Sequence, residues 1–136
     1  MRSAIHTSFG EPVDVLSLGD QPMPHPAAGE VRIKTLLAPI HNHDLWTIRG
    51  RYGYKPELPA IGGSEAVGVV ERVAVAGVHG TWAEYFLAPA RLLVPMPEAI
   101  PDEVAAQLIA MPLSALMLLE FLNVKPGQWI AQNTAN

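Results

Sequence analysis

The residues of this chain that could do chemistry gather between His41 and Val70. His41, His43 and Asp44 bring two imidazoles and a carboxylate close together, and Tyr52 follows them in a loop. Imidazoles, carboxylates and phenols can transfer protons or hold a hydrogen bond to a developing negative charge. Any active site in the chain is therefore expected in this stretch.

Several of these residues also have a structural interpretation. Asn42 or His43 can cap a short helix that begins at Asp44, and the Asp44 carboxylate can brace the same loop, the role that we favour for it. Glu65 follows Gly-Gly-Ser at the start of an expected strand, and we expect it to be hydrogen-bonded rather than catalytic. His41 and His43 are polar enough to face a cleft, although a lone histidine is more often a satisfied loop residue.

Composition excludes several classes of function. The chain has no cysteine, which removes disulfides, thiolate nucleophiles and zinc sites built on sulfur. Nine basic and 13 acidic residues give a net charge of -4 without a basic block, so nucleic acid is not an expected partner. The N-terminus lacks the apolar core of a signal peptide, and no apolar run is long enough to span a bilayer. We therefore expect no membrane partner and a cytoplasmic location.

The first hundred residues predict a small β-barrel or sandwich. Thirteen prolines and 11 glycines in 136 residues favour short strands and tight corners over a helical bundle. The segment 65–75 is largely apolar around Gly68, which predicts one long strand that bends at the glycine. The expected strands are 1–5, 13–18, 31–38, 65–75, 81–88 and 92–95.

From Pro101 onward the pattern becomes helical. Pro101-Asp-Glu is typical of a helix start, and a second helix, 113–122, is apolar almost all round and should be covered on several sides. A strand is expected to begin at Gln128. The predicted fold class is mostly β with α.

Eight motifs in fixed order, each weak alone, carry a resemblance to a known family. They are Gly10-Glu-Pro, Pro26-x-x-Gly-Glu-Val, Asp44 before an apolar residue, Gly50-x-Tyr-Gly, Pro59-Ala-Ile-Gly-Gly-Ser-Glu, Gly80-Thr-Trp-Ala-Glu-Tyr, Lys125-Pro-Gly-Gln-Trp-Ile and Gln132-Asn-Thr-Ala-Asn. With them, the whole chain resembles the N-terminal, GroES-like half of the medium-chain dehydrogenase/reductase superfamily. Within it, the similarity is to the zinc-free enoyl-thioester reductase and quinone oxidoreductase branch.

The resemblance implies two regions. Residues 1–100 would be a GroES-like catalytic domain, and residues 101–136 would be connecting helices and the first strand of a truncated, Rossmann-type nucleotide-binding domain. Family members usually carry a longer connection after a strand like Gly68–Glu71, and they continue beyond Asn136. The chain alone is therefore expected to be inactive, and a homodimer of the full-length protein is left open.

The resemblance implies no zinc. In the zinc-dependent relatives a cysteine stands at the position of His41 and a histidine at that of Ser64. The third ligand position, near Met111, offers no suitable zinc ligand either. A catalytic zinc needs three protein ligands. His41 and Glu65 could supply two at most, with His43 as a speculative third.

The resemblance also implies site residues. Tyr52 matches the tyrosine of Gly-x-Tyr in the enoyl-thioester reductases, which is thought to donate toward the substrate after hydride addition. Ser114 matches a residue near the nicotinamide, although a serine in an apolar helix can simply bond to the previous turn. The residues implied to lie close to substrate or cofactor are His41, Asn42, His43, Asp44 and Ser114.

Asn133 and Asn136 resemble the start of a phosphate-binding loop, which implies NADPH or NADH as cofactor. The predicted function is that of a zinc-independent, NADPH-dependent oxidoreductase that reduces an activated C=C bond of a 2-enoyl thioester, or a quinone, as small-molecule substrate. Two alternatives remain. One is a zinc-type alcohol dehydrogenase relative, and the other is a non-enzymatic GroES-like binding or interaction module.

Overall fold

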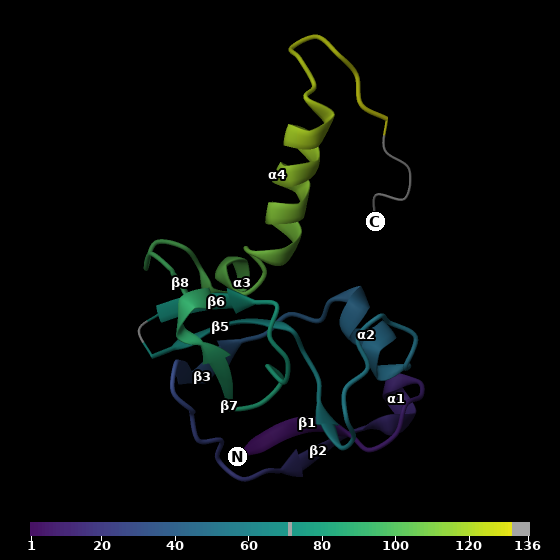
Figure 1. Ribbon diagram of the computed structural model, residues 1–136, viewed down its shortest axis with the longest axis vertical. Helices are drawn as coiled ribbons and strands as arrows, with labels where there is room; N and C mark the ends of the chain where they lie inside the picture. The colour runs from purple at the N-terminus through teal and green to yellow at the C-terminus, as the bar shows by residue number, and fades with distance from the viewer. Residues whose placement is uncertain (71, 132–136) are drawn as a thin grey trace.

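Two antiparallel sheets form the body of the protein in a computed structural model that describes residues 1–70 and 72–131 (Figure 1). The smaller sheet has the order β2-β1-β4, with β1 at Arg2–His6, β2 at Leu16–Asp20 and β4 at Ala60–Ile61. The larger sheet has the order β7-β3-β5-β6-β8. Its strands are β3 at Glu30–Leu37, β5 at Glu65–Val69, β6 at Arg72–Ala76, β7 at Tyr85–Pro89 and β8 at Val94–Pro95.

Short helical segments connect and flank the sheets. They are α1 at Pro12–Val15, α2 at Asn42–Ile48, the 3-10 turn η1 at Ala90–Leu92, α3 at Asp102–Ala105 and α4 at Ala110–Leu122. The predicted class, mostly β with α, is confirmed. No helix of the described residues combines the length and the apolar character that crossing a membrane requires.

The core lies on both faces of β5 and β6. On one face, Ile33 and Phe86 lead a cluster of buried side chains, and on the other Val67 packs with Met96 and with the alanine at the end of α3. Gly68 lies on β5 opposite Thr35 of β3, and a Cβ there would overlap the Ile33 side chain and the Lys34 carbonyl oxygen. Burial on two faces explains why β5 is apolar without alternation.

The predicted single strand over 65–75 is wrong. The chain instead reverses direction, so that β5 and β6 pair antiparallel with Val69 opposite Arg72 and Glu65 opposite Ala76. A largely apolar run has the same sequence pattern whether it forms one long buried strand or two strands of a buried hairpin. Gly68 marks close packing against β3 and not a bend.

Two other expectations also need correction. The strand expected over 13–18 begins only at Leu16, because the preceding residues form α1. The described residues 128–131 form no strand. A strand needs a neighbour to accept its backbone hydrogen bonds, and among the described residues β1 has such a neighbour in β2, whereas 128–131 has none.

Helix α4 stands away from the sheets (Figure 1). It has Pro112 in its first turn and ends at Asn123, which adopts the left-handed conformation. None of its residues is buried, so the cover expected for this apolar helix is not found within the described part of the chain. The division of the chain at residue 100 into two regions stays a prediction.

Candidate functional site

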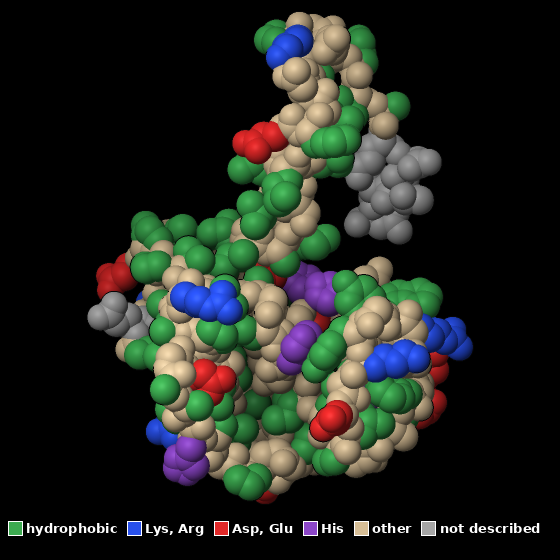
Figure 2. Space-filling model, in the orientation of Figure 1, with side chains coloured by type: hydrophobic (Ala, Val, Ile, Leu, Met, Phe, Trp, Pro, Cys, Tyr) green, Lys and Arg blue, Asp and Glu red, His purple; other side chains and the backbone are tan. Residues whose placement is uncertain are grey.

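A cavity of about 560 Å³ opens beside α2, between the loop that follows α2 and the strand entrance at Ser64. Figure 2 shows histidine side chains around the hollow in the middle of this face. Its polar and aromatic lining includes His43, Asp44, Tyr52, Tyr54, Ser64 and His79. The cavity therefore collects the group types that the sequence suggested for proton transfer.

Helix α2 holds the first of these residues in place. His41 is its N-cap, and the Asp44 carboxylate Oδ2 accepts the backbone N–H of His41 at 2.9 Å. Gly50, with a φ of 70°, ends the helix. The cap is thus His41 and not Asn42 or His43, whereas the predicted bracing role of Asp44 agrees with this hydrogen bond.

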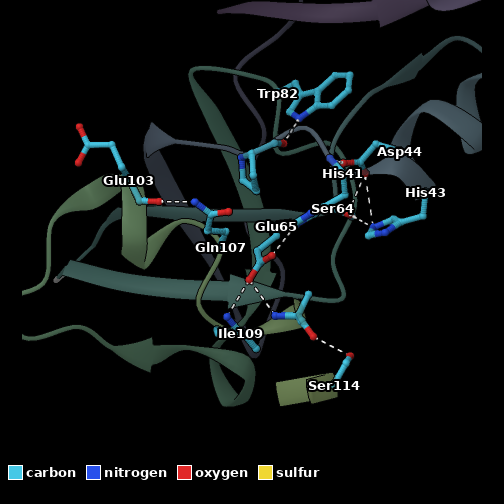
Figure 3. A network of polar contacts seen from close by, with 12 residues as sticks. His41, His43, Asp44, Ser64, Glu65, Trp82, Glu103, Gln107, Ile109 and Ser114 are labelled. Atoms are coloured by element: carbon cyan, nitrogen blue, oxygen red, sulfur yellow. Dashed lines mark hydrogen bonds and ion pairs between the residues drawn. The ribbon is translucent and has the colours of Figure 1, made fainter. Parts of the chain in front are cut away.

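Ser64 links Asp44 to His43. Its hydroxyl donates to Asp44 Oδ1 at 2.7 Å, and His43 Nε2 lies 2.7 Å from the same hydroxyl oxygen (Figure 3). Asp44 is only 4% exposed, so the network reaches from the interior to the cavity. Gly63, with a φ of 90°, precedes Ser64 and leaves room for the Trp82 ring, which a Cβ would overlap.

Glu65 is buried and fully engaged, as expected from its sequence context. Its Oε1 accepts the backbone N–H groups of Ile109 at 2.9 Å and Ala110 at 3.0 Å, at the start of α4. Its Oε2 accepts a hydrogen bond from His41 Nε2 at 2.6 Å (Figure 3). A carboxylate at a helix N-terminus meets free donors and the positive end of the helix dipole. Glu65 therefore ties α2 and α4 together.

Aromatic rings complete the site in two stacks. In the first stack the His43 ring lies in the middle, with Tyr52 on one side at 5.7 Å between ring centroids and His41 at 5.1 Å. In the second, Tyr54 and His79 stack face to face at 3.8 Å. Partial burial lowers the pKa of His79, the Asp44 carboxylate opposes this, and the positive charge that His43 can carry lowers the pKa further.

The predicted site residues divide into four groups. His43, Asp44 and Tyr52 come together at the cavity. His41 and Asn42 are not part of the lining, and His41 is bonded to Glu65. Ser114 is exposed on α4 and donates to the Ala110 carbonyl oxygen, which is the alternative role for a serine in an apolar helix. Asn133 and Asn136 lie outside the described residues.

Sequence reasoning missed the parts of the site that come from other loops. Ser64 was considered only as a zinc-ligand position, and His79 was assigned no role in the site. Neither carries a local signal for its role, because Ser64 bonds to side chains 20 and 21 residues away and His79 stacks on Tyr54.

Within residues 1–70 and 72–131, no three His, Asp or Glu side chains come close enough together to hold a metal ion. The two positions that correspond to zinc ligands in the zinc-dependent relatives are engaged otherwise. His41 is bonded to Glu65, and Ser64 is bonded to both Asp44 and His43.

Comparison with known proteins gives a consistent set of relatives. Residues 27–79 match the alcohol dehydrogenase GroES-like domain. The chain is 36% identical over 150 residues to the mitochondrial enoyl-[acyl-carrier-protein] reductase of Xenopus tropicalis, covering 99% of this chain and 43% of that protein. The human protein of the same name is 34% identical, covering 100% of this chain and 40% of the relative. The chain thus spans about two fifths of the length of the curated relatives that it matches.

A solved structure of a quinone oxidoreductase is also similar to this chain. The quinone oxidoreductase of Thermus thermophilus, which was also solved in complex with NADPH, superposes with a TM-score of 0.86 and 32% identity. The match covers 94% of this chain and 43% of that protein.

The comparison corrects the prediction of a cytoplasmic location, because the curated relatives are named as mitochondrial proteins. That prediction rested on the lack of an apolar leader, which argues only against secretion; import into an organelle uses signals of a different composition. The resemblance predicted from the motifs is confirmed. The chain contains a GroES-like domain at residues 27–79 and belongs to the medium-chain dehydrogenases/reductases, in the branch of the enoyl reductases and quinone oxidoreductases.

Proposed function

We propose that the protein carrying this chain is a zinc-independent, NADPH-dependent oxidoreductase that reduces the activated C=C bond of a 2-enoyl thioester, with quinones as the second substrate class. The observation that carries the proposal is the cavity in which Tyr52, His43 and Asp44 meet, in a chain that is 36% identical to an enoyl-[acyl-carrier-protein] reductase. The similarity to a quinone oxidoreductase is the reason for the second class.

The cavity suits a flat ring and a small substrate. Its volume of about 560 Å³ lies within the usual range of small-molecule sites. Tyr52 and Tyr54 line the cavity with aromatic rings, against which a nicotinamide or a conjugated carbonyl can pack. Bound NADPH supplies a hydride, and the residues of this chain orient the acceptor and hold the charge that develops on it.

Tyr52 is the proposed contact to the substrate oxygen. Its side chain lines the cavity and is half exposed, so its hydroxyl is open to a ligand. When hydride adds to the β-carbon of a conjugated carbonyl, negative charge moves to the oxygen, where a hydrogen bond or proton from Tyr52 stabilises it. Asp44 braces α2, which precedes the Tyr52 loop.

Zinc independence is supported by the engagement of the ligand positions. A catalytic zinc needs three protein ligands, and no three His, Asp or Glu side chains of the described residues come close enough together to supply them. The second ligand position is a serine, whose hydroxyl already donates to Asp44 and lies within hydrogen-bond distance of His43. The zinc-type alcohol dehydrogenase is therefore the weaker alternative. Nothing in the described residues favours a purely non-enzymatic module over an enzyme.

The proposal is tested by following NADPH oxidation by the whole protein with a 2-enoyl thioester and with a quinone. Tyr52→Phe should lower kcat about 10²-fold, because it removes one hydrogen-bond donor to the developing charge. Tyr85→Phe is the matched control, since this tyrosine lies on β7 outside the cavity. Absence of turnover with both substrates would refute the proposal, and unchanged kcat in Tyr52→Phe would remove Tyr52 from it.

A further inference from the structure

Asp44, Ser64 and His43 form a relay of hydrogen bonds that starts at a buried carboxylate and ends at the cavity (Figure 3). The side chain of Asp44 is 3% exposed and that of His43 is 31% exposed. The two residues are adjacent on α2, but their link runs through Ser64, which immediately precedes β5. His43 Nε2 is also 3.7 Å from Asp44 Oδ1.

The chemistry of these groups determines which one donates in each hydrogen bond of the relay. An ionised carboxylate only accepts, so the single hydroxyl hydrogen of Ser64 goes to Asp44. The oxygen of Ser64 then accepts from His43, which places a hydrogen on Nε2. Nδ1 is left for a ligand, because none of the hydrogen bonds among the described residues engages it.

The groups around His43 suit a ring that carries a positive charge during part of a reaction cycle. Asp44 contributes the buried negative charge, and the other titratable groups facing His43 are His41 and Tyr52, whose rings stack on it, and His79 across the cavity. Any charge on His41 is already matched by Glu65 at 2.6 Å. An imidazolium beside an aromatic face and a buried carboxylate interacts favourably with both.

Tyr52, by contrast, is hydrogen-bonded to no group among the described residues that could resupply its proton. None of the hydrogen bonds of the described residues involves its hydroxyl, whereas His43 is linked through Ser64 to the Asp44 carboxylate. Tyr52 can hold an oxyanion, but it has no connected group among the described residues that would return a proton to it.

We propose that His43 is the catalytic proton donor to the substrate in this cavity, and that Ser64 and Asp44 are positioning residues that hold its ring and its charge. The proposal rests on the reductase function proposed above and assigns it a second group beside Tyr52. Tyr52 is then left with the hydrogen bond to the substrate oxygen.

The step balances as an ordinary conjugate reduction. A reduced nicotinamide dinucleotide gives a hydride to the β-carbon, the C=C π electrons move toward the carbonyl, and an enolate forms on the substrate. The imidazolium form of His43 then gives its Nδ1 proton to the α-carbon of the enolate, which becomes the saturated product, and a neutral imidazole with its hydrogen on Nε2 remains. The neutral imidazole then takes a proton from water at Nδ1. The Nε2–H of His43 stays hydrogen-bonded to the Ser64 hydroxyl oxygen throughout.

The positioning part is tested by NMR on the chain itself, with ¹⁵N-labelled histidine. We expect a sharp downfield Hε2 signal of His43, protected from exchange by the bond to Ser64, and its loss in Ser64→Ala. His25, which is exposed in a proline-rich segment, serves as the internal reference without such a signal. A His43 ring that behaves like His25, or one that Ser64→Ala leaves unchanged, would overturn this part.

The catalytic part is tested by chemical rescue in the whole protein. His43→Ala should lower kcat about 10²- to 10⁴-fold with little change in the KM for NADPH, and added imidazole should restore turnover. If the substitution lowered kcat only by loosening the packing, added imidazole would not restore kcat. His25→Gln is the control and should keep full turnover. Thermal unfolding of each variant shows that it is folded before its kinetics are compared.

The outcomes separate the two proposals. A protein that reduces a substrate but keeps its kcat in His43→Ala, or that loses turnover without rescue, overturns the role of His43 and leaves the reductase function intact. A protein that reduces neither substrate refutes the reductase function and the catalytic role of His43 with it. The Hε2 signal then still shows whether Ser64 holds the ring.

Discussion

At the level of single residues, two buried carboxylates organise the site. Asp44 accepts from the backbone of His41 and from Ser64, and Glu65 accepts from His41 and from two backbone N–H groups. Burial of a charge is tolerated because hydrogen bonds replace the lost water. These two residues therefore carry a larger share of stability than exposed acids do.

Glu65→Ala should destabilise the chain by about 2–5 kcal/mol, because it leaves His41 Nε2 and two backbone donors without their acceptor. Glu65→Gln keeps the shape and one acceptor oxygen, so its loss should be smaller. Urea unfolding measures both. A loss below about 1 kcal/mol for Glu65→Ala would show that water replaces the carboxylate freely.

Some of these roles could be predicted from the sequence and others could not. Asp44 lies at a helix start and Glu65 at a strand entrance after Gly-Gly-Ser, so local rules indicate that both are hydrogen-bonded. The partners of His43 and His79 are contacts between loops that are distant along the chain. Hydrophobic periodicity carries no information about such contacts.

At the level of elements, the loop before β5 is fixed by close packing. Gly63 has a φ of 90°, and a Cβ there would overlap Trp82 and the Thr81 hydroxyl. Trp82 is itself held by the hydrogen bond from its Nε1 to the Pro39 carbonyl oxygen at 3.0 Å. The ring cannot move aside without breaking that bond.

Gly63→Ala should therefore cost about 2–5 kcal/mol, the sum of the left-handed penalty and the overlap. Gly77→Ala is a matched comparison with a φ of 71° and no heavy atom within 4 Å of the added Cβ. It should cost only about 1–2 kcal/mol. Thermal unfolding of the two variants checks the difference, and equal losses would contradict the packing argument.

The elements themselves were partly predictable. Alternation and turn residues located β1 and β3 within one residue of their observed bounds, whereas β7 begins at Tyr85, four residues after the predicted start. The hairpin of β5 and β6 was missed, because both strands are buried on two faces and form one largely apolar run in the sequence. Helix α4 was predicted from its apolar residues. The sequence did not predict which part of the protein covers them.

At the level of the whole molecule, stability should fall with acidification partly through His79. Burial lowers the pKa of His79 from its ordinary 6.5, so the unfolded chain takes up a proton before the folded chain does as pH falls below this value. Folding is thus disfavoured at lower pH, and His79 contributes nothing to this slope at higher pH, where both states are neutral. The effect is small because the residue keeps solvent contact.

His79→Gln should flatten the decrease of the melting temperature between about pH 7.5 and pH 5, the range in which histidine changes its charge. His25→Gln, at an exposed site, should leave the slope unchanged. Identical pH profiles for the wild-type protein and His79→Gln would show that Tyr54 and the cavity do not disfavour the protonated ring.

The most direct test of the proposed function is the reduction of a 2-enoyl thioester by the whole protein after removal of metal ions with a chelator. We predict NADPH-dependent loss of the double bond at the same rate before and after chelation, because no three His, Asp or Glu side chains of the described residues come close enough together to hold a metal ion. Activity that disappears with chelation and returns with zinc would contradict this assignment.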